Sequence, residues 1–275
     1  MKTERSSTSG PALSRFVVRL GASLGVAFLA VPLGVLCFTL PWDAFTSGLA
    51  RPAARDALVV SLQTTAASLA LVLLTGTPMA WLLAQVPAGT RLRRRERLRA
   101  VLEALVALPA VLPPAVAGVA LLLVFGRRGV PGAWLDAHGL SPAFTAVAVV
   151  LAQAFVALPV YAQAATSAFR RVDPRRIWVA RSLGAGPARA FWAVAVPLAL
   201  PGILGGAALA WARALGEFGA TLLFAGSLPG RTQTLPLAIY AALETDLHAA
   251  QALSVLLVAV ALLVLVLLRT LAPAS

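Results

Sequence analysis

Six long apolar runs, separated by short polar or basic stretches, dominate the chain. Each run has at least the roughly 20 residues that a helix needs to cross about 30 Å of hydrocarbon. This pattern predicts an all-α integral membrane protein with six transmembrane helices, because a helix satisfies its own backbone hydrogen bonds in lipid. The runs are residues 17–40, 57–86, 100–125, 143–169, 198–225 and 249–268.

The start of the chain determines how the first run is interpreted. Residues 1–16 are polar and rich in Ser and Thr, which predicts a disordered tail. The basic residues before the run also fit a secretory signal peptide. However, the run is longer than a signal core of about 7–15 residues, and no small-residue cleavage site follows it. We therefore interpret 17–40 as an uncleaved membrane helix, followed by a short polar connection at 41–56.

Proline and glycine modify two of the runs. Pro109, Pro113 and Pro114 interrupt the third run, where each removes a backbone donor. Such breaks are tolerated in a membrane where protein or a water-lined cavity covers the freed groups. In the fifth run, Gly202 and Gly206 form a G-x-x-x-G pair, which predicts close packing against another helix.

The basic residues indicate on which side of the membrane each loop lies. The chain has 23 Lys and Arg against 10 Asp and Glu, although only 12% of its residues are charged and 60% are hydrophobic. Seventeen of the 23 lie in the two termini and in the loops 91–99 and 170–197, whereas five lie in the other loops. By the positive-inside rule, both termini and these two loops are cytoplasmic. Because topology in a lipid bilayer accounts for the charge, we expect no nucleic-acid partner.

The cytoplasmic loop 170–197 carries its own helix signals. Asp173 can cap a helix N-terminus, and Pro174 suits the first turn. Gly184 can end that helix in the left-handed conformation, and a second short helix then runs towards Pro197. Two short helices joined by a glycine turn, on a basic loop, indicate a docking site for a partner outside the membrane.

Arg213 and Glu217 are strongly charged residues deep inside a predicted span. A charge at the membrane centre costs about 2.5–3.5 kcal/mol on insertion scales. The two residues are four apart, so they share a helix face and can neutralise each other. Two interpretations stay open: a salt bridge that locks the helix bundle, or a pair that lines or gates a polar pathway for an anion. Thr221, in the same run, belongs to the same candidate pathway.

A second group of polar residues lies in the run 57–86. Ser61, Thr64 and Thr65 form a hydroxyl-rich patch in this otherwise apolar segment. These side chains can face a pore, or they can form hydrogen bonds with neighbouring helices. We include them in the candidate translocation path.

The sequence lacks the motifs of the common catalytic sites. A P-loop needs a lysine after its glycines, and Lys2 is the only lysine of the chain. With the single cysteine Cys37, an intrachain disulfide is impossible, and the isolated His138 and His248 do not suggest a metal site. We therefore expect no enzyme activity, no bound cofactor and no metal ion in this chain.

The segment 57–269 resembles the membrane subunit of type-one ABC importers. That family's signature loop reads E-A-A, then glycine after three residues, and later I-x-L-P; here Gly184 matches the glycine and Ala180 the second alanine. Trp178 stands where glutamate is usual. In the family this loop docks into a groove of a cytoplasmic ATPase subunit. The resemblance implies an ATPase-coupling loop that includes Trp178, Ala180, Leu183, Gly184, Ala185, Gly186 and Pro197.

Three further segments are similar to the molybdate permeases of this family. They are LPAVLPPAVAGVALLLVFGRRG in the third run, ARALGEFGATLLFAG in the fifth, and PGRTQTLPLAIY at 229–240. The GEFGAT core is shared with sulfate and thiosulfate permeases, so that part implies an oxyanion only. The resemblance implies a homodimeric permease in a bacterial or archaeal plasma membrane that imports molybdate by alternating access. It also implies a partner ATPase that uses ATP and Mg²⁺, and a periplasmic or extracellular oxyanion-binding protein.

Two alternatives stay open from the sequence. The first is the permease of a sulfate, thiosulfate or tungstate importer, which has the same architecture. The second is a stand-alone anion channel or secondary carrier, which needs no ATPase.

Overall fold

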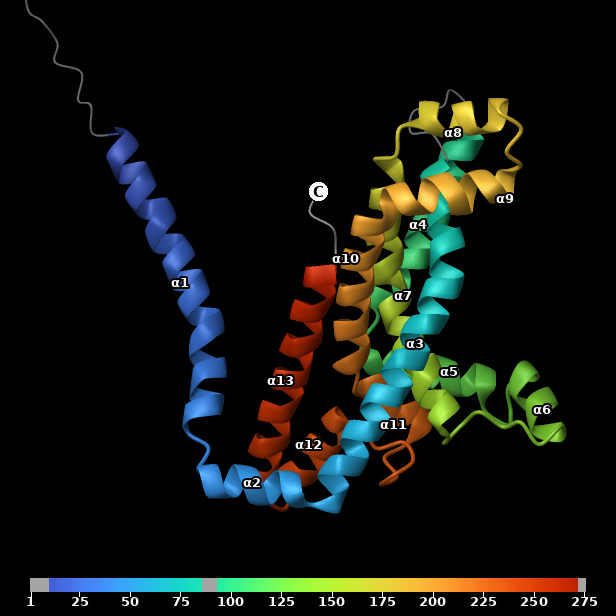
Figure 1. Ribbon diagram of the computed structural model, residues 1–275. Helices are drawn as coiled ribbons and strands as arrows, with labels where there is room; N and C mark the ends of the chain where they lie inside the picture. The colour runs from blue at the N-terminus through green and yellow to red at the C-terminus, as the bar shows by residue number, and fades with distance from the viewer. Residues whose placement is uncertain (1–9, 86–92, 272–275) are drawn as a thin grey trace, which may run out of the picture.

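The computed structural model describes residues 10–85 and 93–271. These residues form helices joined by short loops, and the described part of the chain contains no strand (Figure 1). The elements are α1 (Gly10–Phe38), α2 (Trp42–Ala50), α3 (Pro52–Gln85), α4 (Arg93–Val111), α5 (Pro114–Phe125), α6 (Val130–Ala137), α7 (Ala146–Arg170), α8 (Pro174–Ser182), α9 (Pro187–Ala190), the π-helical turn η1 (Phe191–Ala195), α10 (Val196–Leu215), α11 (Gly219–Ala225), α12 (Leu235–Leu243) and α13 (Leu247–Leu271).

Five helical segments are long and apolar enough to cross a membrane: α1, α3, α7, the continuous stretch from α9 to α10, and α13. A sixth arises if α4 and α5 count as one span. The all-α membrane architecture expected from the six apolar runs is therefore confirmed.

The third predicted span is sharply bent. α4 and α5 meet at an angle of 110° instead of forming one straight helix over 100–125. The bend lies at Pro113 and Pro114, which follow the end of α4. Proline lacks the backbone donor of a helix and restricts the residue before it, so the chain turns at this pair. Pro109, by contrast, is accommodated inside α4.

The prediction of one helix over 198–225 is wrong. α10 ends at Leu215, and α11 is a separate short helix that begins at Gly219. The stretch also begins earlier, because α9, η1 and α10 run without a break from Pro187. Gly216 caps the end of α10, and the carboxylate of Glu217 just after it accepts from the N–H of Ala220 in the first turn of α11.

Stretches expected as tail or loop also contain helices. The connection 41–56 consists largely of α2 and the first turn of α3. α6 and α12 lie within two further loops. α1 begins at Gly10, so residues 10–16 are helical rather than part of a disordered tail; residues 1–9 lie outside the described part. α4 begins at Arg93, so most of the expected basic loop 91–99 is helical. The other bounds differ by a few residues from those expected.

The packed centre of the molecule consists of α3, α7 and α10. A Cβ atom placed on Gly202 or Gly206 would lie 2.4 Å from the Cβ of Ala168 or 2.8 Å from that of Ala164. The G-x-x-x-G pair therefore lets α10 pack directly on α7, as expected. α1 extends away from this centre in Figure 1, and its described side chains are largely exposed.

Candidate functional site

The signature loop forms the two-helix unit that its sequence predicts. Asp173 caps α8, and its carboxylate accepts a hydrogen bond of 2.9 Å from the backbone N–H of Arg175. Gly184 lies in the turn just after α8, and its φ of +88° is in the left-handed region. A Cβ at Gly184 would meet nothing within 4 Å, so the backbone angle is what requires glycine there.

The second helix of the unit does not stop at Pro197. This residue is the second residue of α10, directly after the π-helical turn η1. Proline cannot donate the usual backbone hydrogen bond. In η1 the N–H of Val196 bonds to the carbonyl of Phe191, five residues back, and the helix thereby continues across the proline.

α8 lies at one end of the molecule, called here the α8 end (Figure 1), and most of its residues are exposed. No residue of this helix is buried. The side chain of Trp178 is 70% exposed, and Leu183, just after the helix, is 84% exposed. Ala180 and Ala185 are half-buried, whereas Gly186 is exposed. Large apolar side chains that are open on a basic surface are typical of a docking face.

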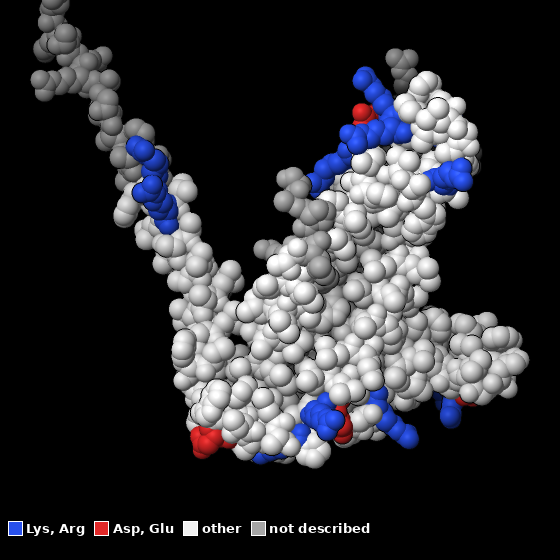
Figure 2. Space-filling model, viewed as in Figure 1, with Lys and Arg blue, Asp and Glu red and all other residues white. Residues whose placement is uncertain are grey.

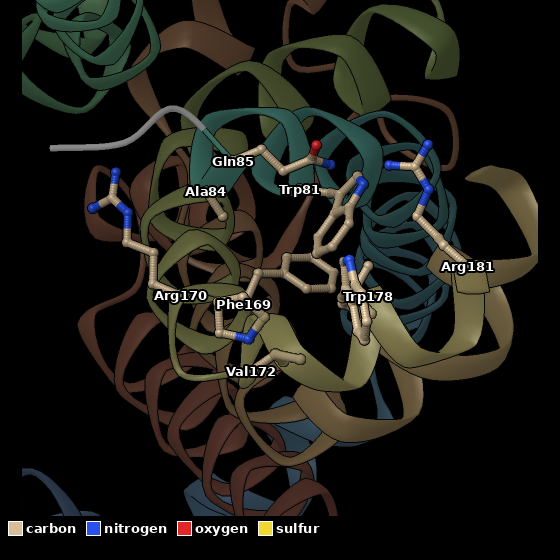
Figure 3. A pocket seen from close by; sticks show the side chains of 10 residues that line it. Trp81, Ala84, Gln85, Phe169, Arg170, Val172, Trp178 and Arg181 are labelled. Atoms are coloured by element: carbon tan, nitrogen blue, oxygen red, sulfur yellow. The ribbon is translucent and has the colours of Figure 1, made fainter. Parts of the chain in front are cut away.

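Aromatic rings hold this unit on the bundle. The ring of Trp81 lies 5.3 Å from that of Phe169 and 5.7 Å from that of Phe191, so α3, α7 and η1 meet there. Beside this cluster is a cavity of about 490 Å³, on which Trp81, Phe169 and Trp178 converge (Figure 3). Arg170 and Arg181 also line the cavity. The sequence did not predict that these rings meet, because its only signal was an aromatic residue near the end of each run.

The predicted pair of Arg213 and Glu217 is present. A guanidinium nitrogen of Arg213 lies 2.8 Å from a carboxylate oxygen of Glu217. The Glu217 side chain is 1% exposed, and that of Arg213 is 35% exposed. The other carboxylate oxygen accepts a hydrogen bond of 2.8 Å from the N–H of Ala220, so Glu217 also caps α11. This second bond gives Glu217 a structural role at the break between α10 and α11.

The hydroxyl groups of α3 are largely used within the bundle. Ser61 accepts a hydrogen bond of 2.7 Å from the N–H of Leu235, which ties α12 to α3. Thr64 and Thr65 donate to carbonyls one turn earlier in α3. Within the described residues, no hydrogen bond or ion pair joins this group to Arg213 or Glu217. The structure thus separates the expected path residues into two groups.

Thr221 lies in α11 and is fully buried. Its hydroxyl oxygen has no hydrogen-bond partner in the described part of the chain. A buried polar atom without a partner costs free energy, so Thr221 lowers the stability of α11 in this conformation.

The opposite end of the molecule, called here the α2 end, carries the loop 226–234 (Figure 1). Three backbone N–H groups of this loop, those of Arg231, Thr232 and Gln233, point at the carbonyl of Leu228. These bonds hold the backbone of the loop, and the side chain of Thr232 is fully buried. The buried hydroxyl of Thr234, by contrast, has no hydrogen-bond partner among the described residues.

A salt bridge also lies at the α2 end. Arg51 and Asp246 are 2.7 Å apart and connect the start of α3 with the start of α13. The pKa of Asp246 lies below its ordinary value, first because the N–H of Ala249 donates to the carboxylate and then because Arg51 does. Basic side chains lie at the α2 end and, in a second group, at the α8 end (Figure 2).

Comparisons with known proteins agree with this architecture. Residues 76–274 match the family model described as "Binding-protein-dependent transport system inner membrane component". The chain is 48% identical over 247 residues to the "Molybdenum transport system permease protein ModB" of Mycobacterium tuberculosis, covering 90% of each chain. It is 39% identical over 191 residues to the ModB protein of Escherichia coli strain K12, covering 69% of this chain and 80% of the relative.

Solved structures show the same fold at low sequence identity. A chain of a bacterial alginate ABC transporter superimposes with a TM-score of 0.72 at 14% identity, over 95% of this chain and 94% of that chain. A chain of the MetNI methionine ABC transporter gives 0.62 at 20% identity, over 78% and 93%. With several apolar spans and a family model that covers most of its length, the chain belongs to the family of multi-pass inner membrane components of binding-protein-dependent transport systems.

Proposed function

We propose that the chain is the membrane subunit of an ATP-driven molybdate importer. In this proposal it works as a homodimer, with a cytoplasmic ATPase on each copy and an external binding protein that delivers the oxyanion. The observation that carries the substrate is the 48% identity to molybdenum permeases over 90% of both chains. Similarity over nearly the whole length includes the spans as well as the docking loop.

The α8 end is the proposed ATPase-docking face. Its α8–α9 unit is exposed, basic and held in shape by Asp173 and Gly184. The chain carries no P-loop lysine, so ATP and Mg²⁺ belong to the partner subunit in this proposal. The excess of arginine in the termini and in the loops at this end supports a cytoplasmic orientation for both termini.

The connections of α8 explain how a partner would move the bundle. α8 follows α7 after three residues, and its companion α9 continues through η1 into α10. α7 and α10 are packed on each other at Gly202 and Gly206. A displacement of α8 is therefore transmitted to α7 and α10 together. Rigid-body movement of two such bundles would open a path alternately to each side, in an alternating-access cycle.

Reconstitution with the other components tests this function. The chain is co-expressed with the ATPase and binding protein, and the purified complex is placed in proteoliposomes. We expect molybdate uptake that requires both ATP and the binding protein, together with molybdate-stimulated ATP hydrolysis. Uptake of sulfate or thiosulfate in preference to molybdate would reassign the substrate, and tungstate is included as a competitor.

The same assay on the chain alone tests the alternative class. A stand-alone channel or secondary carrier would transport the oxyanion without ATPase and without ATP. Uptake by the isolated chain at the rate of the complex would contradict the proposal of an ATP-driven importer.

A further inference from the structure

The loop 226–234 holds its backbone in one conformation. The carbonyl of Leu228 accepts from the N–H groups of Arg231, Thr232 and Gln233 at 3.0–3.1 Å. The Thr232 hydroxyl accepts from the N–H of Leu228 at 3.0 Å and donates to the carbonyl of Gly226. Gly226 and Gly230 both adopt positive φ angles, of +72° and +69°. The point of the backbone from which a side chain of this loop projects is therefore fixed.

Arg231 is the side chain that this loop presents. It is exposed, whereas Thr232, Gln233 and Thr234 after it are buried. No hydrogen bond or ion pair engages its guanidinium among the described residues, unlike Arg51, which pairs with Asp246 at the same end. The carboxylate of Asp56 lies near the loop, 3.7 Å from a Cβ placed on Gly230, but it is not within ion-pair distance of Arg231.

Arg231 lines a cavity of about 400 Å³ between this loop, α3 and the start of α7. The other polar side chains at its wall are Gln63, Thr64 and Thr145. None of the residues that line this cavity is acidic.

The groups of this cavity are suited to an anion. The guanidinium of Arg231 offers up to five N–H donors in a planar arrangement that matches oxyanions. The exposed amide of Gln63 adds two donors. Ala146 is the first residue of α7, a helix of 25 residues whose N-terminus carries partial positive charge. Thr145 already accepts from the N–H of Val147, so the helix contributes this charge rather than that donor. The hydroxyls of Thr64 and Thr145 already donate to backbone carbonyls, so they shape the wall rather than supply donors.

We propose that Arg231, Gln63 and the N-terminus of α7 form an oxyanion-binding site at the α2 end of each permease copy. The inference rests on the proposed function, in which the α2 end faces outward. A tetrahedral oxyanion released by the binding protein is held there before it enters the translocation path. The buried part of the PGRTQT segment serves to position the arginine, and the arginine contacts the ion.

Direct binding tests this site without the binding protein. The permease–ATPase complex is purified, and its retention of radiolabelled molybdate is measured by equilibrium dialysis, with sulfate as competitor. We expect Arg231→Ala to weaken retention about tenfold, as for loss of a charge-assisted hydrogen-bonded group. Arg231→Lys keeps the charge but loses the planar donors, so we expect an intermediate loss; Gln63→Ala gives a smaller loss.

Arg128→Ala is the matched control, because Arg128 is an exposed arginine at the turn between α5 and α6 and does not line the cavity. We expect this variant to bind like the unmodified complex. Equal retention by Arg231→Ala and Arg128→Ala, or no retention by the unmodified complex, overturns the site. If Arg231→Ala fails to assemble, Arg231→Lys and Gln63→Ala decide by the same criteria.

Uptake assays separate this site from a protein contact and from the proposed function itself. If Arg231→Ala leaves molybdate retention intact and raises only the half-saturating concentration of the binding protein, Arg231 contacts that protein and the site is wrong. If the unmodified complex imports molybdate normally while the variants behave like the control, the site fails and the proposed function stands. If the unmodified complex retains and imports only sulfate, the molybdate assignment fails.

Discussion

The loops at the α8 end and at the α2 end of the molecule are held in place by different interactions. At the α8 end, the two-helix unit leaves Trp178 and Leu183 open and is anchored from below by the rings of Trp81, Phe169 and Phe191. At the α2 end, the loop 226–234 holds its backbone by hydrogen bonds to its own carbonyl of Leu228. Apolar packing leaves a surface that a partner can cover, whereas internal hydrogen bonding fixes the backbone that carries Arg231.

The largest expected effect comes from Gly184→Val at the α8 end. A β-branched residue in the left-handed region costs about 1–3 kcal/mol of backbone strain, so the unit is expected to distort. We expect oxyanion uptake to fall about tenfold or more while ATP hydrolysis continues, because the coupling geometry is lost. The measurement is uptake per ATP hydrolysed in proteoliposomes.

Gly186→Ala is the matched control for this substitution. Gly186 has a φ of −64°, which any residue can adopt, and a Cβ there meets nothing within 4 Å. This variant is expected to transport normally. Equal transport by both variants would show that the glycine turn does not matter for coupling.

The second effect in size concerns Glu217, between the two ends. Glu217→Ala removes the partner of Arg213 and the cap of Ala220, for an expected loss of about 3 kcal/mol. We expect lower protein levels and a lower unfolding temperature, with a normal half-saturating molybdate concentration in the protein that survives. A changed half-saturation with unchanged stability would instead support a pathway role for the pair.

Glu217→Gln separates the two contributions of this residue. Its amide oxygen can still accept from the N–H of Ala220, but the negative charge is gone. The stability of this variant is expected to lie between that of the unmodified protein and that of Glu217→Ala. A Gln variant as unstable as the Ala variant would assign the whole effect to the ion pair.

Trp178 tests whether the open surface of the α8 end recognises the ATPase. The side chain is 70% exposed, so Trp178→Ala is expected to leave the unfolding temperature of the isolated chain nearly unchanged. Loss of a large aromatic contact is expected to weaken ATPase binding about tenfold. The affinity is measured by titration of the ATPase onto the immobilised permease. Unchanged affinity would remove Trp178 from the interface.

The smallest expected effect is at the α2 end, at the pair of Arg51 and Asp246. Because the pKa of Asp246 is lowered in the folded protein, its contribution to stability is present above its unfolded pKa and is lost as the pH falls through the folded pKa. We expect a small drop in unfolding temperature on acidification below the ordinary Asp range. Asp246→Asn, which can still cap α13, is expected to show less of this drop. An identical pH profile for both proteins contradicts the assignment.

The sequence predicted the elements whose cause is local. The apolar runs indicated the spans, Asp173 and Gly184 marked the ends of α8, and the four-residue spacing predicted the contact of Arg213 with Glu217. Each of these depends on residues that are close together in the chain. The replacement of the usual glutamate by Trp178 is likewise evident from the loop's sequence alone.

The features that the sequence did not predict depend on contacts between distant segments. In the run 198–225, Arg213 and Glu217 were interpreted as a pair on one continuous helix, so the sequence did not predict the break after Leu215. The aromatic cluster joins Trp81, Phe169 and Phe191 from three runs, which only the packed bundle brings together. Ser61 is a further example. The N–H of Leu235, 174 residues later in the chain, donates to its hydroxyl, and a contact between two distant runs cannot be inferred from either run alone. Without that contact, the sequence left Ser61 as a candidate for the translocation path.

The π-helical turn η1 has a consequence for how the docking unit is aimed. A helix advances about 100° per residue, so the additional residue held in this turn offsets the face of α9 by about that angle relative to α10. Deleting one residue between Phe191 and Ala195 would remove this phase shift and rotate the docking helices around the axis of the span. Because the ring of Phe191 in this turn packs against Trp81 and Phe169, such a deletion would also disturb the contact that holds the unit on the bundle.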